Sequence, residues 1–163
     1  MPMLHGSRIK LFSEMALNVE NNIFFSEVES LLSQGESVTI KVRGCSMMPW
    51  LRDGKHSVVV RRHAAADVKV GVVMFYVYRG RWLMHRLRKI DGDKLYFAGD
   101  GNYRQWEVVG PEALRGVVVS IISPVGRVMK CESGVWRFKS CLWLTLPAIV
   151  RRYILAIVRR LKL

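Results

Sequence analysis

Three residues of this chain have the types and the order of a nucleophile, a base and an orienting acid. Ser46 lies in a turn bounded by glycine and proline, His85 lies in a β-like run, and Asp100 lies in a Gly-Asp-Gly-Asn turn. A serine hydroxyl is a weak nucleophile unless a neighbouring base takes its proton and a third group orients that base. Histidine titrates near neutral pH, which suits a general base. Together the three indicate nucleophilic catalysis, although each alone is also typical of a turn or a surface strand.

The elements that must position these residues are short β-rich runs separated by glycine-containing turns. Apolar, β-branched and aromatic residues are frequent in the runs, which cover residues 37–43, 58–61, 72–78, 82–88, 94–97 and 117–122. Ser46 comes shortly after the first run, and His85 lies within the fourth. Many short strands of this kind predict a mainly β (α+β) fold with a sheet or barrel-like body.

Helical segments are predicted at both ends of this body. Apolar residues at helix-compatible spacing predict a helix over residues 7–34, with a break at 21–24 left open. Residues 127–130 and 135–138 are expected to form a last hairpin. The chain is thus divided into a helical segment (1–35), a β domain (36–126) and a hairpin followed by a basic helix (127–163).

The C-terminal helix is expected to begin near Pro147, since proline is tolerated in a first helical turn. One side of this helix is apolar and the other is basic, with Val150, Ile154, Ile157 and Leu161 opposite Arg151, Arg152, Arg159 and Lys162. Such a helix suits three partners: an anionic membrane surface, another protein, or the β body of this same chain.

The charge of the chain is strongly positive, with 26 Lys and Arg against 13 Asp and Glu. Residues 127–163 alone carry nine basic residues and one acidic residue. A field of this sign favours anionic partners. The three cysteines (45, 131 and 141) form no CxxC pair and indicate reduced thiols in a cytoplasmic protein. The four histidines lack zinc-ligand spacing to them, so no metal or other cofactor is expected.

Over residues 36–126 the chain resembles the signal peptidase and LexA-like serine peptidases. Ser46-Met47-Met48-Pro49 matches the nucleophile box, His85-Arg86 matches the branch with a histidine base, and residues 99–102 match the downstream Gly-Asp-x-Asn box. The resemblance implies a coiled β-sheet barrel and a serine endopeptidase that cuts a leader or signal peptide after small residues. It implies Ser46 as nucleophile, His85 as general base and Asp100 as orienting acid. Glu107 is a second candidate for the orienting acid.

Two departures from the family bear on the expected activity. Bacterial signal peptidases carry a hydroxyl residue two positions before the nucleophile, where this chain has Gly44. An oxyanion hole would then depend on backbone amides, those of Ser46 and Gly44. No uncharged stretch reaches the roughly 20 apolar residues of a membrane span, so a membrane anchor like the family's N-terminal one is not expected in this sequence. The expected location is the cytoplasm, with peripheral contact at the inner membrane face.

Alternatives remain open at this point. Cys45 adjoins Ser46 and is a second candidate nucleophile, and Lys69 and Lys89 are candidate bases that do not fall on the matching position. A relative that binds peptides with little turnover would keep the same fold. Nucleic-acid binding is not favoured: it would rest on charge alone, which gives salt-sensitive, nonspecific contacts.

Overall fold

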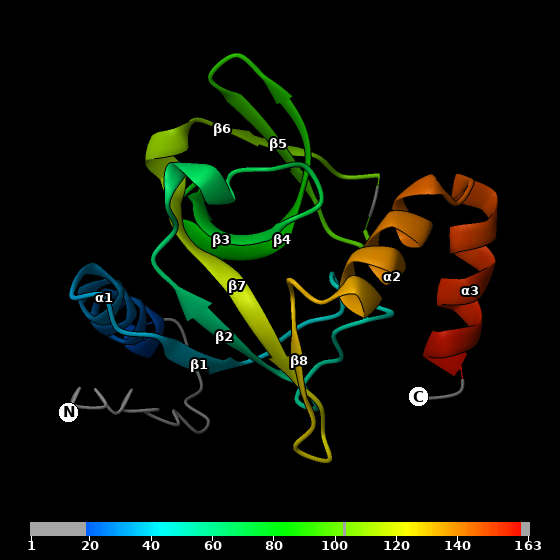
Figure 1. The fold of residues 1–163 in the computed structure, drawn as a ribbon, viewed down its shortest axis with the longest axis horizontal. Coiled ribbons are helices and arrows are strands. Elements are labelled where there is room, and N and C mark those ends of the chain that lie inside the picture. The colour runs from blue at the N-terminus through cyan, green and yellow to red at the C-terminus, as the bar shows by residue number, and fades with distance from the viewer. Residues whose placement is uncertain (1–18, 103, 161–163) are drawn as a thin grey trace.

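A curled antiparallel β-sheet forms the body of the protein in the computed structural model, which describes residues 19–102 and 104–160 (Figure 1). Its eight strands are β1 (Val38–Lys41), β2 (Ser57–Arg61), β3 (Val73–Tyr78), β4 (Arg81–Asp91), β5 (Lys94–Ala98), β6 (Glu107–Val109), β7 (Leu114–Ile122) and β8 (Val128–Lys130). Hydrogen bonding gives the order β1-β2-β7-β3-β4-β5-β6, with β8 also paired to β7. The sheet is a half-barrel, so the predicted mainly β, α+β class is confirmed.

Both faces of the sheet bury apolar side chains, because successive residues of a strand point to opposite faces. On β3, Val73 and Phe75 enter one core cluster while Met74 and Tyr76 enter the other. The four consecutive buried residues 73–76 are therefore divided between two core clusters. The six β runs predicted between residues 37 and 122 overlap β1 to β5 and β7, and β6 is an additional strand.

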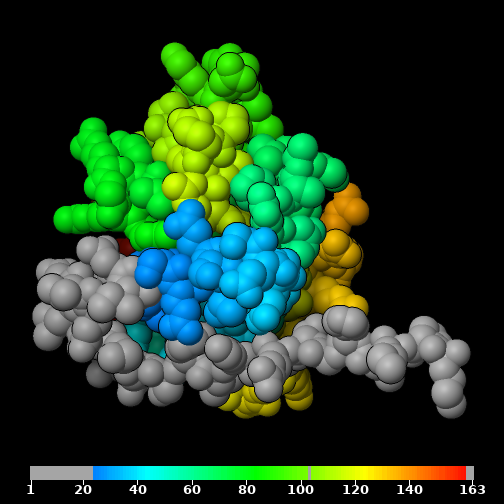
Figure 2. Space-filling view, turned by 90° about the vertical axis from the view of Figure 1, so that its left-hand side faces the viewer, coloured from blue at the N-terminus to red at the C-terminus, as the bar shows by residue number. Residues whose placement is uncertain are grey.

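Helix α1 (Val19–Ser33) covers one face of the sheet. Its Val28 and Leu32 are buried in the same cluster as Val58 and Phe75. Figure 2 views this face, with α1 in front of the sheet. The predicted helix over residues 7–34 is observed from residue 19; its first part lies outside the described residues.

Helices α2 (Gly134–Thr145) and α3 (Ala148–Arg160) follow the sheet and lie together at one side of it (Figure 1). The start of α3 agrees with the prediction from Pro147. The predicted hairpin over 127–138 is wrong in its second half, because β8 pairs with β7 and residues 135–138 are helical. Ser133 is the N-cap of α2, since its Oγ accepts a hydrogen bond from the Trp136 amide at 3.3 Å.

The inner side of α2 is fixed by residues at helical spacing. Trp136, Ser140 and Trp143 are buried against the body.

Within the described part of the chain, no single helix is long and apolar enough to cross a bilayer. Taken together, α2 and α3 meet that length and composition criterion, with a bend of 117° between them.

Candidate active site

The turn that carries Ser46 follows the edge strand β1 and is held from both sides. Gly44 has a φ of +83°, a left-handed conformation that glycine adopts without strain. Its amide donates to Asp53 Oδ1 at 2.8 Å, which closes the turn. Met47 and Met48 are buried, whereas Ser46 is partly exposed. The turn is thus anchored by its methionines while the serine remains accessible.

The segment after β5 packs directly on this turn. The Gly101 amide donates to the Ser46 carbonyl at 2.7 Å. A Cβ atom at Gly99 would collide with the Ser46 carbonyl oxygen and lie 3.1 Å from Ser46 Cβ, and one at Gly101 would lie 2.6 Å from the Cys45 carbonyl. Both positions therefore require glycine, and the Gly-Asp-Gly-Asn turn is a backbone support for the Ser46 turn.

The end of the β4–β5 ladder connects His85 to this segment. Arg86 on β4 pairs with Ala98, the last residue of β5, so His85 and Gly99 each lie one residue beyond this pair. Because the Ser46 turn packs on Gly99, His85 and Ser46 both adjoin this end of β5. Among the described residues no hydrogen bond joins the two side chains, and none is made by His85 Nε2.

Glu107 and Tyr76 hold the other nitrogen of His85. Glu107 on β6 pairs with Phe97, and its Oε2 lies 3.1 Å from His85 Nδ1. Tyr76 on β3 donates its hydroxyl hydrogen to the same Oε2 at 3.3 Å and lies 3.2 Å from Nδ1. His85 and Glu107 are only 7% and 3% exposed, so water does not compete for these contacts. The free position of the imidazole is then Nε2, as a general base for serine requires.

Tyr76 remains a neutral donor in this cluster. Burial raises the pKa of the Tyr76 hydroxyl, and the neighbouring Glu107 carboxylate raises it further. Sequence reasoning did not select Tyr76. Tyr76 could have been selected because it lies in an apolar β run that is expected to be buried, and a buried tyrosine hydroxyl needs a hydrogen-bond partner.

Asp100 occupies a different site from the one expected. Its carboxylate accepts hydrogen bonds from Arg86 Nε at 2.9 Å and Arg86 Nη2 at 2.6 Å, and neither side chain is exposed. His85 and Arg86 are neighbours on β4 and point to opposite faces of the sheet. Asp100 therefore contacts Arg86 in place of the His85 contact that was expected, and the second candidate acid, Glu107, is the one that contacts His85.

Arg86 links this pair to the surrounding elements. Its Nη1 donates to the Gly71 carbonyl at 2.6 Å and to Ser140 Oγ at 3.0 Å, and its guanidinium lies 5.4 Å from the ring centroid of Trp136. Trp143 Nε1 donates to the Asp100 carbonyl at 3.2 Å. The buried ion pair thus fastens α2 to the loop that supports Ser46.

The two amides predicted for an oxyanion hole differ in availability. The Gly44 amide is taken by Asp53 Oδ1, so it is not free in this conformation. Of the two backbone amides predicted for the oxyanion hole, only that of Ser46 is without a hydrogen bond in the described residues.

The alternative site residues lie at the surface. Cys45 is exposed, and Lys89 is exposed and paired with Asp91 at 2.9 Å. Lys69 is also exposed. In the ranges 19–102 and 104–160, no group of three or more His, Cys, Asp or Glu side chains is arranged to hold a metal ion.

Comparison with known proteins adds no family assignment. No protein-family model matches the chain, and no curated protein gives a significant match. The function is therefore inferred from the geometry of Ser46, His85 and Glu107 and from the motifs that carry them.

Proposed function

We propose that this protein is a serine endopeptidase of the signal peptidase and LexA-like type. Ser46 is the nucleophile, His85 is the general base and Glu107 orients His85. The observation that carries the proposal is the buried His85–Glu107 contact of 3.1 Å beside the glycine segment on which the Ser46 turn packs.

The reaction follows from the two nitrogens of His85. Ser46 Oγ attacks the peptide carbonyl carbon while Nε2 takes the hydroxyl proton, and the hydrogen on Nδ1 stays on that nitrogen and is donated to Glu107 Oε2. The protonated imidazole then gives its proton to the departing amine, and the C–N bond breaks. Water, deprotonated by the same Nε2, releases the acyl group from Ser46. The lack of a Ser46–His85 hydrogen bond in the free protein is compatible with this reaction. In enzymes without substrate, catalytic hydrogen bonds are often long, and they tighten when substrate binds.

Turnover is expected to be slow. The Ser46 amide is an available oxyanion donor, and Gly44 provides no hydroxyl and has its amide engaged by Asp53. Removal of one oxyanion donor costs about 10²–10³ in rate in serine peptidases.

An extended peptide is the proposed substrate class. Strand β1 lies at one end of the sheet order and leads directly into the Ser46 turn. Edge strands bind extended peptides by adding a strand. The resemblance suggests leader or signal segments that are cut after small residues.

The test is digestion of a peptide library, with cleavage products identified by mass spectrometry. Wild type should cut after small residues, and Ser46→Ala and His85→Ala should not. Cys45→Ala is the matched control, because it changes the adjacent exposed side chain of the same turn. Equal cleavage by wild type and Ser46→Ala, or loss of cleavage in Cys45→Ala alone, would contradict the proposal.

One observation favours a second function, a peptide-binding relative with little turnover. The engaged Gly44 amide leaves the oxyanion site short of a donor. Peptide binding without cleavage by any variant would select this function.

A further inference from the structure

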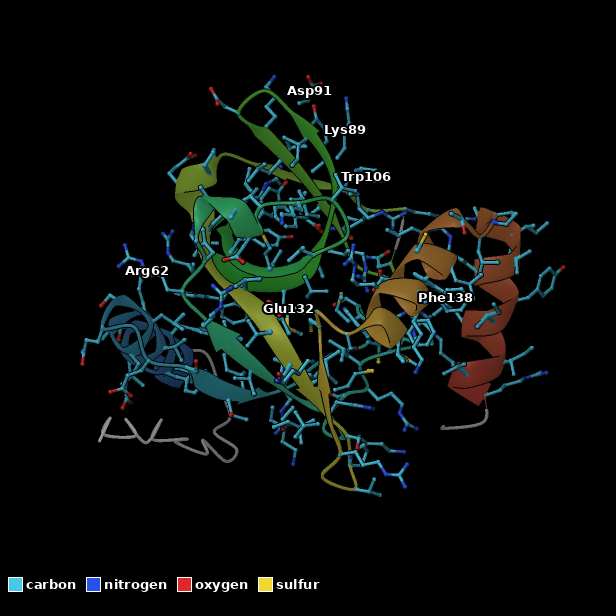
Figure 3. All side chains as sticks on the ribbon, in the orientation of Figure 1. Arg62, Lys89, Asp91, Trp106, Glu132 and Phe138 are labelled. Carbon is cyan, nitrogen blue, oxygen red and sulfur yellow. The ribbon has the colours of Figure 1, made fainter. Side chains whose placement is uncertain are left out.

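Helices α2 and α3 present large apolar side chains to solvent. We call this set the apolar strip, and it consists of Val135, Phe138 and Leu142 on α2 and Ile149, Val150, Tyr153 and Ile157 on α3. Phe138, which is 69% exposed, is labelled in Figure 3 on the side of the molecule that carries both helices. Large apolar side chains that gather on an exposed surface commonly mark interaction sites.

The apolar strip is not the side by which the helices pack on the body. Trp143 and Leu155 are buried with Met48 in one cluster, and Ile154 and Val158 pack against that cluster. Each helix therefore has one apolar side that stabilises the fold and a second that the fold leaves uncovered. The apolar side predicted for the C-terminal helix is thus divided in the structure. Ile154 packs inward, whereas Val150 and Ile157 are exposed.

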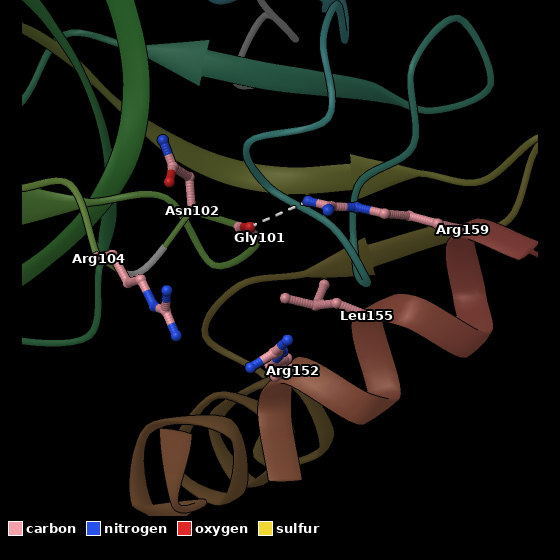
Figure 4. Close-up of a pocket in the computed structure, with 6 residues that line it drawn as sticks. All are labelled: Gly101, Asn102, Arg104, Arg152, Leu155 and Arg159. Atoms are coloured by element: carbon pink, nitrogen blue, oxygen red, sulfur yellow. Dashed lines mark hydrogen bonds between the residues drawn. The ribbon is translucent and has the colours of Figure 1, made fainter. Parts of the chain in front are cut away.

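A basic pocket borders the same helix. It has a volume of about 320 Å³ and is lined by Gly101, Asn102, Arg104, Arg152, Leu155 and Arg159 (Figure 4). Arg159 donates to the Gly101 carbonyl at 3.3 Å, which ties α3 to the loop. Three guanidinium groups and no carboxylate line the pocket, so its chemistry suits a phosphate or another multivalent oxyanion.

Helical spacing sets the pocket beside the apolar strip. Arg152 and Arg159 are seven residues apart and lie on one side of α3 with Leu155 between them. Ile149, Tyr153 and Ile157 repeat every four residues on an adjoining side. Neither α2 nor α3 contains an acidic residue. Basic residues next to exposed aromatic and aliphatic residues are typical of helices that lie in a membrane interface.

We infer that the α2–α3 pair docks the protein on an anionic phospholipid membrane, with the apolar strip in the acyl boundary and a lipid phosphate in the three-arginine pocket. Charge complementarity selects this occupant over an uncharged surface, since the two helices carry only basic charges. The inference is independent of the peptidase activity.

Vesicle co-sedimentation of the full-length chain tests this inference. Vesicles of phosphatidylcholine alone are compared with vesicles that also contain phosphatidylglycerol, at equal ionic strength. The wild-type chain is expected to bind the anionic vesicles at least about tenfold more strongly, since each basic residue near an anionic surface contributes about fivefold. Equal binding to both vesicle types, or to neither, would overturn the inference.

Two variants separate the pocket from the apolar strip. Arg152→Gln with Arg159→Gln should weaken binding roughly 25-fold, and Arg62→Gln with Lys69→Gln is the matched control at exposed basic sites elsewhere. Tyr153→Ser with Ile157→Ser should weaken binding at least about tenfold, with Val125→Ser and Val128→Ser as exposed apolar controls. Circular dichroism confirms that each variant is folded.

Two further measurements separate membrane docking from catalysis and from self-association. Ser46→Ala should bind vesicles as wild type does, so that failure of docking and failure of catalysis are told apart. A dimer in light scattering that Tyr153→Ser with Ile157→Ser dissociates would assign the apolar strip to a second copy of the chain and overturn the inference.

Discussion

At the scale of single residues, two acids near the site have separate tasks. Glu107 contacts His85, and Asp100 contacts Arg86. The order of the motifs in the sequence could not separate them, because both acids follow His85 within a short distance. What separates them is strand alternation: adjacent residues of β4 face opposite sides of the sheet. Ser46, His85, Asp100 and Glu107 were all candidates from the sequence, whereas the choice of Glu107 over Asp100 as the partner of His85 required the pairing of β5 with β6.

Substitution of the two acids should therefore have different effects. Glu107→Gln is expected to lower kcat by about 10³–10⁴ with small loss of stability, because the imidazole loses its oriented tautomer. Asp100→Asn is expected to lower the free energy of unfolding by about 3–5 kcal/mol, because Arg86 is left charged and buried without its carboxylate. Cleavage rates and urea denaturation of both variants measure this. The reverse pattern would return the orienting role to Asp100.

At the scale of elements, the glycine segment after β5 supports the backbone of the Ser46 turn. Gly99→Ala is expected to reduce cleavage about 100-fold or more, because the added methyl group displaces the Ser46 backbone and a misplacement of about 1 Å costs about 100-fold in rate. Gly134→Ala is the control, since its added Cβ meets no atom within 4 Å. It should leave cleavage unchanged and leave stability equal or slightly higher. Equal activity of wild type and Gly99→Ala would show that this contact does not shape the site.

The free energy of unfolding should decrease in mild acid because of His56, which lies in the turn after Ser46. The Arg52 amide donates to His56 Nδ1 at 3.2 Å, which requires a neutral imidazole. Burial lowers the pKa of His56 below its ordinary 6.5, and the charges of Arg52 and Lys55 lower it further. A lowered pKa means that the unfolded chain binds the proton more readily, so stability is full above pH 6.5 and declines as the pH falls below it.

His56→Asn tests this dependence, because the amide oxygen keeps an acceptor but does not titrate. Thermal unfolding of wild type and variant is compared near neutral pH and in mild acid. The acid-induced decrease in Tm should be smaller in the variant. The same turn holds Gly44 through Asp53, so wild-type cleavage should also decrease in acid. An identical Tm decrease in both proteins would assign the acid sensitivity to other groups.

Elements were predictable from sequence to different degrees. Strands with dense β-branched and aromatic residues, such as β3 and β7, were predicted correctly. Residues 135–138 follow the turn at 132–134 and were therefore predicted as the second strand of a hairpin, although Trp136, Ser140 and Trp143 repeat at helical spacing and Ser133 can cap a helix. The three-residue strand β6 is too short to carry a pattern, and it exists because it pairs with β5.

At the scale of the whole molecule, the C-terminal helices belong to the fold. Trp143 contacts Asp100 and Ser140 contacts Arg86, so α2 completes the environment of the buried ion pair. The sequence predicted a basic helix here but not this attachment, because the contacts join residues more than forty positions apart.

Truncation separates the roles of the two helices. A chain that ends after Phe138 should fail to fold stably, because Arg86 and Asp100 lose Ser140 and Trp143. A chain that ends after Leu146 keeps these contacts and should fold, with a lower Tm from loss of the Leu155 contact. Circular dichroism and thermal unfolding of both chains check this. A stable fold in the shorter chain would show that α2 is dispensable.

The most direct test of the central claim is site-resolved labelling of Ser46 with a fluorophosphonate. The serine oxygen displaces fluoride from phosphorus only when a base takes its proton, so labelling reports activation without a known substrate. Mass spectrometry of the tryptic peptide 44–52 should find the adduct on Ser46 in wild type. Labelling should be absent in Ser46→Ala and strongly slowed in His85→Ala and Glu107→Gln. Labelling on Cys45 instead, or at equal rates in wild type and His85→Ala, would contradict a serine nucleophile activated by the His85–Glu107 pair.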